Sequence, residues 1–211
     1  MAFAPIEREH LCDVLDQADP EGATLCPPWR VHDLACHLWI RENDPSAAIG
    51  LVVKSLAGRT EARMQSLRAE MSYGALVGLL RQGPPKHSLF ALPAADEQAN
   101  PMEYFTHAED IRRAPDSTFE RRQVSPEFQD YLWRRLPGVA RLTFRRSTIG
   151  LVLERPNGKL IQLRPGASIV TLVGEPSELL LYAYGRREVA AVELIGEADS
   201  VLRLEQVDLG I

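Results

Sequence analysis

The chain has 211 residues, of which 45% are hydrophobic and 25% are charged, and its formal net charge at pH 7 is -5. These values are typical of a globular protein with a buried core, either one compact unit or two small domains, and they give no reason to expect nucleic-acid binding. No apolar stretch approaches the roughly 20 residues that span a bilayer, and the charged N-terminus does not resemble a signal peptide, so we expect a cytoplasmic protein without a membrane partner.

The three cysteines, Cys12, Cys26 and Cys36, are odd in number and lack Cys-x-x-Cys spacing. This pattern predicts neither a disulfide framework nor a cysteine-type zinc site, and we expect three reduced thiols. Cys36 adjoins His37 but would point about 100° away from it on a helix, so we interpret Cys36 as a buried structural thiol.

Residues 3–82 carry hydrophobic side chains at the helical period, interrupted by turn residues. This pattern predicts amphipathic helices over residues 3–18, 60–70 and 73–82. It also predicts two further helices that begin near residues 31 and 45. In the second helix, Leu34, Leu38 and Trp39 form the buried side, and His37 lies beside that stripe. His32 is five residues from His37, about 140° around a helix, so we place His32 on the surface.

Residues 83–98 break the helical pattern with Gly83-Pro84-Pro85 and Pro93. We predict a long loop here, of the kind that often packs across a functional site. His87 in this loop could reach a pocket as an acid or base, although a solvated side chain is the plainer interpretation. After the loop we expect a new helix, with Asn100 as its N-cap and Pro101 in its first turn.

Within that helix, Glu103, His107 and Asp110 follow one another at spacings of four and three. A helix turns about 100° per residue, so the three side chains fall within a sector of about 60° on one face. Glu103 and His107 form a Glu-x-x-x-His pair, by which one helix offers two ligands to a divalent metal. A third ligand must come from another element, and His37 is the best donor upstream. The alternative is a pair that serves only surface or packing contacts.

The C-terminal part changes character after a long predicted helix over residues 126–146. The segment 112–146 holds nine Arg against four acidic residues, and we interpret it as a solvated helical region whose Arg stems cover apolar surface, rather than as a DNA-binding face. β-type patterns follow at 148–153, 160–163, 169–173 and 189–195, with a hairpin turn at Asn157-Gly158 and short helices near 175 and after 196. The sequence therefore predicts an α+β protein, with a helical domain over residues 1–146 and a small α+β domain over 147–211.

Two motifs of the chain carry a resemblance to a known family. They are Glu103-x-x-x-His107-x-x-Asp110 and, some 65 residues earlier, Leu25-Cys26-x-x-Trp29-x-Val31-x-Asp33-Leu34-x-x-His37-Leu38. The pattern resembles the actinobacterial branch of the DinB-like superfamily that includes mycothiol-dependent maleylpyruvate isomerase. The resemblance implies a DinB-like helix bundle followed by a small sterol-carrier-like domain. It also implies a divalent metal, usually zinc, held by His37, Glu103 and His107, with mycothiol as the thiol cosubstrate.

Three protein ligands would leave a coordination position open, which is the catalytic rather than the structural arrangement for zinc. A thiol entering that position would become a thiolate, and a water would be acidified toward neutrality. Asp110 could support a ligand imidazole, pair with Arg113 or act as a fourth ligand. Arg112 and Arg113 are candidates for attracting an anionic substrate or thiol cofactor, and the candidate catalytic residues are Asp110, Arg113 and His87. No substrate arginine is marked by spacing among Arg155, Arg164, Arg186 and Arg187.

The leading functional hypothesis is a metal-dependent and thiol-dependent isomerase or transferase that acts on a small electrophile. Two alternatives stay open: a metal-binding or ligand-binding module without turnover, and a metal-dependent hydrolase that uses water. A monomer and a homodimer are both compatible with the sequence.

Overall fold

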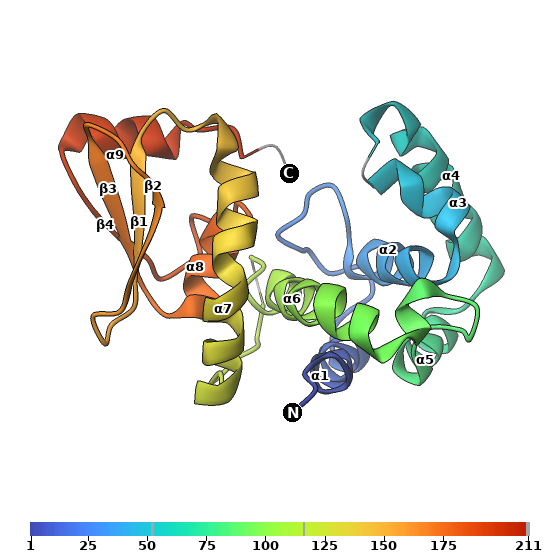
Figure 1. The fold of residues 1–211 in the computed structure, drawn as a ribbon. Coiled ribbons are helices and arrows are strands. Elements are labelled where there is room, and N and C mark those ends of the chain that lie inside the picture. The colour runs from blue at the N-terminus through green and yellow to red at the C-terminus, as the bar shows by residue number, and fades with distance from the viewer. Residues whose placement is uncertain (52, 116, 210–211) are drawn as a thin grey trace. The chain divides into compact units, whose positions relative to one another are not determined.

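The computed structural model describes residues 1–51, 53–115 and 117–209 (Figure 1). The chain forms two compact units, Met1–Arg121 and Arg122–Ile211. The first is helical and the second combines helices with a four-stranded sheet, so the predicted α+β class is confirmed. The division falls one helix before the boundary we expected at 146/147, because the helix at Pro126–Thr143 packs on the short helix at Pro176–Ala183 of the second unit.

The first unit contains six of the described α-helices: α1 (Ala4–Gln17), α2 (Val31–Asn43), α3 (Pro45–Ala48), α4 (Ala57–Glu70), α5 (Tyr73–Gln82) and α6 (Pro93–Arg112). Short 3-10 turns lie at Ile49–Leu51, Lys54–Leu56 and Leu89–Ala91. The Asp44 side chain caps α3 by accepting a hydrogen bond from the Ala47 N–H, and Pro45 occupies the first turn as predicted. That helix is much shorter than the pattern indicated.

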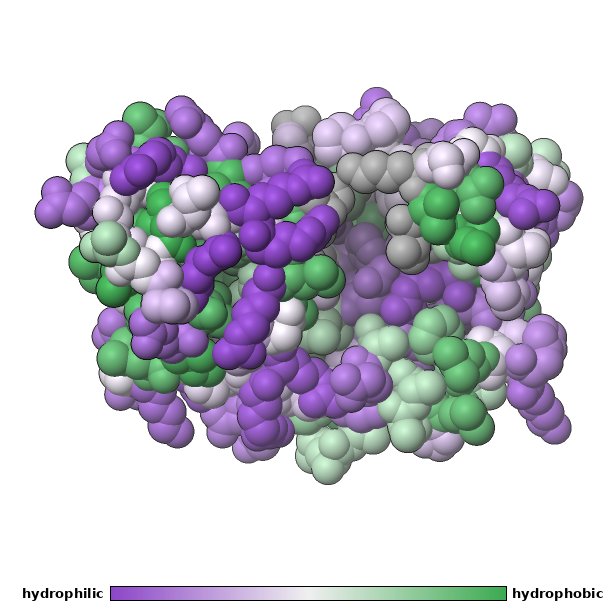
Figure 2. All heavy atoms as spheres, turned by 45° about the horizontal axis from the view of Figure 1, so that its top comes forward, coloured by the Kyte–Doolittle hydropathy of each residue, from purple (hydrophilic) through white to green (hydrophobic). Residues whose placement is uncertain are grey.

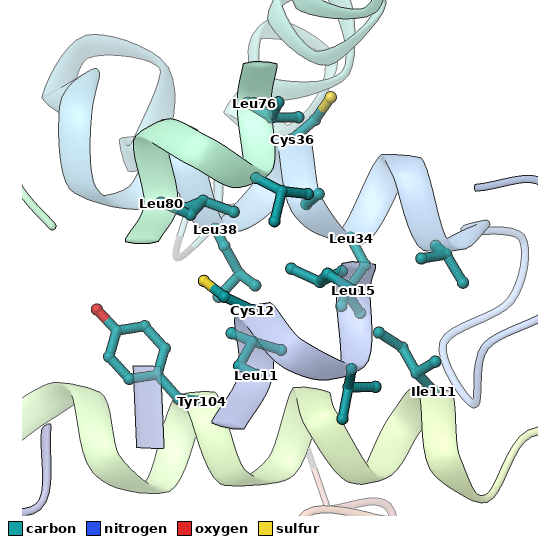
Figure 3. Close-up of a cluster of buried hydrophobic side chains, with 14 of the residues drawn as sticks. Leu11, Cys12, Leu15, Leu34, Cys36, Leu38, Leu76, Leu80, Tyr104 and Ile111 are labelled. Atoms are coloured by element: carbon teal, nitrogen blue, oxygen red, sulfur yellow. The ribbon is translucent and has the colours of Figure 1, made fainter. Parts of the chain in front are cut away.

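The core of the first unit lies between α1, α2, α5 and α6. Figure 3 shows its side chains, which come from all four helices: Leu11, Cys12 and Leu15, then Leu34, Cys36 and Leu38, then Leu76 and Leu80, and finally Tyr104 and Ile111. Cys36 is fully buried among them, as the sequence predicted. Burial raises the pKa of the Cys12 and Cys36 thiols to about 12, so both stay protonated packing groups. This core fixes how α2 lies against α6, the two helices that carry the candidate ligands.

The start of α6 differs from our prediction. The helix begins at Pro93 and continues through Pro101, so the loop before it is shorter than the expected 83–98 segment. Asn100 is not a cap: it is fully buried, and its amide donates to Asp96 Oδ1 at 2.6 Å. The early start of α6 adds about two turns, which lie against α1.

The prediction for His32 was also wrong. His32 is 9% exposed and therefore buried, and its ring meets the Tyr73 ring edge-on with 5.3 Å between centroids. The 140° separation from His37 does hold, but α4 and α5 also pack on α2 and cover that second side. His10, in contrast, is exposed on α1.

The second unit contains α7 (Pro126–Thr143), α8 (Pro176–Ala183) and α9 (Ala198–Glu205) and the strands β1 (Gly150–Glu154), β2 (Leu160–Arg164), β3 (Ile169–Val173) and β4 (Glu193–Ile195). The strand order is β2-β1-β3-β4, with β1 antiparallel to β2, parallel to β3, and β3 antiparallel to β4. Leu151 lies opposite Val170, and the hairpin between β1 and β2 turns at Gly158, whose φ of 80° favours glycine.

Arginine side chains of the second unit lie over aromatic rings. The Arg135 guanidinium is 4.1 Å from the Tyr131 ring centroid, and that of Arg155 is 5.7 Å from the Trp133 centroid. The Arg135 contact lies in the segment 112–146 and agrees with our interpretation that Arg side chains there cover apolar surface. On the face seen in Figure 2, hydrophobic residues form separate areas among hydrophilic ones. Among the described residues, no helix combines the length and apolar character needed to cross a bilayer.

Candidate metal centre

The structure brings Glu103, His107 and His37 together, two of them from α6 and one from α2. Nε2 of His37 and Nε2 of His107 each lie 3.3 Å from the same carboxylate oxygen, Glu103 Oε1. The two imidazole rings meet nearly edge-on, with 5.1 Å between centroids. The ligand atoms of all three side chains fall within 4.8 Å of one another. The histidine side chains are about nine-tenths buried, whereas the Glu103 side chain is 27% exposed, so the group is reached from the Glu103 side.

The 3.3 Å separations are long for hydrogen bonds and also suit two ligands of one shared metal. Two ligands about 2.0–2.1 Å from a tetrahedral zinc are about 3.3 Å apart, whereas an N–H to oxygen hydrogen bond is most often about 2.9–3.0 Å. Two imidazole nitrogens and one carboxylate oxygen also form a donor set that zinc prefers. The three residues therefore fit a divalent metal by both atom type and spacing.

A second group, formed by Cys26, His107 and Asp110, has a different geometry. Asp110 Oδ2 lies 2.9 Å from His107 Nδ1, and the Cys26 thiol donates to the same oxygen at 3.1 Å. These distances are those of hydrogen bonds, so we interpret this group as support for His107 rather than as a second metal site. Asp110 is fully buried and keeps the Nδ1 proton, which leaves His107 Nε2 as the atom that faces Glu103. Of the three roles considered for Asp110, the geometry favours support of a ligand imidazole.

The loop between α1 and α2 supports both histidines, a role that the sequence did not reveal. The Leu25 N–H donates to the Asp110 carbonyl at 3.0 Å, which ties the loop to α6 and places Cys26 behind His107. Trp29, from the same loop, packs on His37 with 4.9 Å between ring centroids. Trp29 also contacts the core, so its ring lies between the core and a candidate ligand. The Cys26 and Trp29 positions belong to a loop without periodicity, so only the family resemblance marked them.

The pKa values of His37 and His107 are shifted in opposite directions. Burial lowers the pKa of His37, and its hydrogen bond to Glu103 only partly offsets that effect. Burial also disfavours the charged form of His107, but hydrogen bonds to Asp110, Cys26 and Glu103 outweigh it and raise the pKa of His107 well above its usual range. For Glu103, burial is likewise outweighed by hydrogen bonds to both histidines and by the charge of Arg41, and its pKa is lowered well below its usual value. Without a metal, these pKa shifts favour a protonated His107 beside an ionised Glu103.

Arg41 is a further neighbour of Glu103, and it was not among the predicted site residues. Its Nε lies 3.5 Å from Glu103 Oε1, the oxygen that both imidazoles face. Its Nη1 donates to Asn100 Oδ1, and its guanidinium lies 4.7 Å from the Phe90 ring centroid. The signal was present in the sequence, because Arg41 follows His37 by four residues and must share its helix face.

The other predicted site residues do not belong to the group formed by His37, Glu103 and His107. His87 is exposed, in the turn that follows Pro85. Arg113 donates to Glu109 Oε2 at 2.5 Å, and Arg112 forms an ion pair with Glu109 Oε1 at 3.5 Å. Both therefore face a buried carboxylate that lies about 120° around α6 from Glu103. In the second unit, Arg155 pairs with Asp130, while Arg164, Arg186 and Arg187 donate to backbone carbonyls.

A hollow of about 410 Å³ on the first unit does not coincide with this group. Its lining includes Gly22, Val31, Ile111 and Phe119, and none of the three candidate ligands. The candidate centre is therefore defined by its side-chain geometry rather than by this concavity.

The chain is similar to known proteins in its fold but not detectably in its sequence. No protein-family model matches the chain, and no curated protein matches its sequence. Among solved structures, a mycothiol-dependent maleylpyruvate isomerase is similar with a TM-score of 0.61 and 18% sequence identity, over 93% of this chain and 92% of that one. A histidine-to-alanine mutant of such an isomerase is similar with a TM-score of 0.57 and 17% identity, over 90% of each chain. At this identity the likeness shows the fold alone: the chain folds like these isomerases over most of its length.

Proposed function

We propose that the chain binds one divalent metal, most suitably zinc, through His37, Glu103 and His107. The observation that carries this proposal is the position of Glu103 Oε1, 3.3 Å from Nε2 of both histidines. We further propose that the metal-loaded protein is a thiol-dependent isomerase or transferase that acts on a small electrophile. The similar folds of the mycothiol-dependent isomerases support this activity and make mycothiol the suitable cosubstrate.

The residues of the chain have separate roles in this proposal. His37, Glu103 and His107 hold the metal, and Asp110 keeps a proton at His107 Nδ1 so that Nε2 is free to bind. Cys26 orients Asp110, and Trp29 limits the rotation of the His37 ring. When bound, a zinc ion supplies an open position at which a thiol is stabilised as its thiolate. The partial exposure of Glu103 leaves a side from which the thiol and the electrophile can approach.

Metal content tests the site. Purified wild-type protein, His37→Ala and Glu103→Ala are loaded with zinc, desalted and assayed for bound metal, with His10→Ala as the control because His10 is exposed on α1. We expect about one zinc per chain in the wild type and the control, and a large loss in the two ligand variants. Undiminished zinc in both ligand variants would rule out the site.

Thiol dependence tests the reaction. The zinc-loaded protein is incubated with maleylpyruvate or an alkylating electrophile, with and without mycothiol, and loss of the electrophile is followed by absorbance. A thiol-dependent enzyme consumes the electrophile only when the thiol is present. Turnover without thiol would instead favour the hydrolase, and zinc binding without turnover of either kind would favour a binding module.

A further inference from the structure

Arg41 is held rigidly beside the candidate ligand Glu103. Its partner Asn100 is fully buried and is itself fixed by Asp96, whose Oδ1 lies 3.0 Å from Arg8 Nη2. The Phe90 ring covers the Arg41 guanidinium, and the Arg41 side chain is only 17% exposed. Within the part of the chain that the structure describes, Glu103 is the carboxylate that forms an ion pair with Arg41. These contacts hold the Arg41 guanidinium beside Glu103.

The formal charges of Arg41, Glu103 and Asp110 determine which further ion the centre can accept. A guanidinium stays charged at all accessible pH values. Asp110 accepts hydrogen bonds from Cys26 and His107, as a carboxylate does, and Glu103 is the other carboxylate of the group. Counting Glu103, Asp110, a divalent metal and Arg41, the two carboxylates would offset the metal and Arg41 would add one positive charge; the Arg8–Asp96 ion pair behind Asn100 is neutral as a pair.

We propose that Arg41 makes this centre a receptor for one small monoanion, which in the proposed function is the thiolate. This inference rests on the proposed metal site and adds a residue that selects the charge of the incoming group. Arg41 acts through electrostatics and through its contact with Glu103, not as a metal ligand, so its removal should affect anion binding far more than metal binding. Charges a few ångströms apart near a protein surface interact by several kcal/mol at most, enough for a tenfold or larger change in affinity.

The test uses cobalt as a spectroscopic substitute for zinc and azide as a simple monoanion. Wild type, Arg41→Gln and Arg41→Lys are loaded with Co²⁺, and azide is titrated while the visible absorption of the metal is recorded. Arg63→Gln is the matched control, because Arg63 also lies over an aromatic ring, that of Trp39, but pairs with Asp44 and Glu70. We expect Arg41→Gln to retain Co²⁺ and to bind azide at least about tenfold more weakly, with Arg41→Lys and the control within about threefold of wild type.

Three results would overturn the inference. Equal azide affinity in wild type and Arg41→Gln shows that the charge is not used, and loss of Co²⁺ from folded Arg41→Gln shows that Arg41 serves the metal instead. If Arg41→Gln does not fold, the test rests on Arg41→Lys, which keeps the positive charge without the planar guanidinium. A tenfold loss of azide affinity in Arg41→Lys contradicts the proposal. A wild-type protein that binds no Co²⁺ is a different result, because it removes the proposed function as well.

Discussion

The carboxylate of Asp110 lies 2.9 Å from Nδ1 of His107, on the opposite edge of the imidazole ring from Glu103. This contact determines which ring nitrogen carries the proton and so which one can bind a metal. It also joins the candidate ligands to the loop of Cys26, since the thiol donates to the same carboxylate oxygen. The centre thus consists of an inner group of three side chains and a buried group that orients one of them.

Asp110→Asn should weaken metal binding without removing a ligand. The amide can present its N–H to His107 Nδ1 and favour the wrong tautomer, with the proton on Nε2. Loss of such a supporting partner typically costs about 10-fold to 100-fold in metal affinity. Competition with a chromophoric chelator measures the affinity, and Asp130→Asn serves as a control in the second unit. An affinity within twofold of wild type would mean that Asp110 does not orient His107.

Cys26 should matter as a hydrogen-bond donor rather than as a metal ligand. We therefore expect Cys26→Ser to keep the metal affinity of the wild type, because the hydroxyl can still donate to Asp110. Cys26→Ala removes the donor and should lower the free energy of unfolding by about 1 kcal/mol. Urea denaturation and chelator competition on both variants test this pair. A sulfur-to-cobalt charge-transfer band in the Co²⁺-loaded wild type, absent from Cys26→Ser, would show instead that the thiol binds the metal.

Parts of the fold with strong local signals could be predicted closely. The helix at 73–82 and the strand at 169–173 agree with the structure to the residue, because Ser72 caps the first and the second is a run of β-branched residues interrupted only by Leu172. The start of α6 could not be found in this way. Asn100-Pro101 has the local chemistry of a helix start, but the buried contacts of Asn100 with Asp96 and Arg41 keep both residues inside the helix.

The candidate centre was predictable in its spacing but not in its surroundings. Periodicity placed Glu103, His107 and Asp110 on one face, and His37 was the available third donor. The surrounding contacts depend on tertiary structure: Cys26 and Trp29 reach the histidines from a loop, and His32 is buried by Tyr73 from another helix. Such contacts leave no periodic trace in the sequence. Whether the three central residues bind a metal stays a prediction.

Glu109 should stabilise the fold without affecting metal binding. Its carboxylate is 1% exposed and faces Arg112 and Arg113, both near the C-terminal end of α6. Glu109→Gln removes a buried carboxylate that contacts both half-buried guanidinium groups, and we expect a loss of about 3 kcal/mol in the free energy of unfolding. Metal affinity should stay within about twofold, because Glu109 faces away from Glu103. Urea denaturation and chelator competition on the same preparation check both parts. A large loss of metal or thiol binding with little loss of stability would restore Arg112 and Arg113 as cofactor-binding candidates.

Metal binding should release a proton from His107. The folded-state pKa of His107 lies well above its unfolded value of about 6.5. The charged imidazole therefore stabilises the metal-free protein fully below that unfolded pKa, and this contribution is lost as the pH rises through the folded pKa. His37 contributes no such proton at neutral pH, because burial lowers its pKa.

A metal that binds His107 Nε2 has to displace this proton, so its affinity should rise with pH up to the folded pKa of His107. At pH 7 we expect about one proton released per metal bound. Calorimetric titration with Zn²⁺ in buffers of different ionisation enthalpy measures that number directly. Asp110→Asn is the informative comparison, because loss of the carboxylate lowers the pKa of His107 and should reduce the proton release. Tight zinc binding without any release from the wild type would contradict the protonated state that Asp110, Cys26 and Glu103 impose on His107.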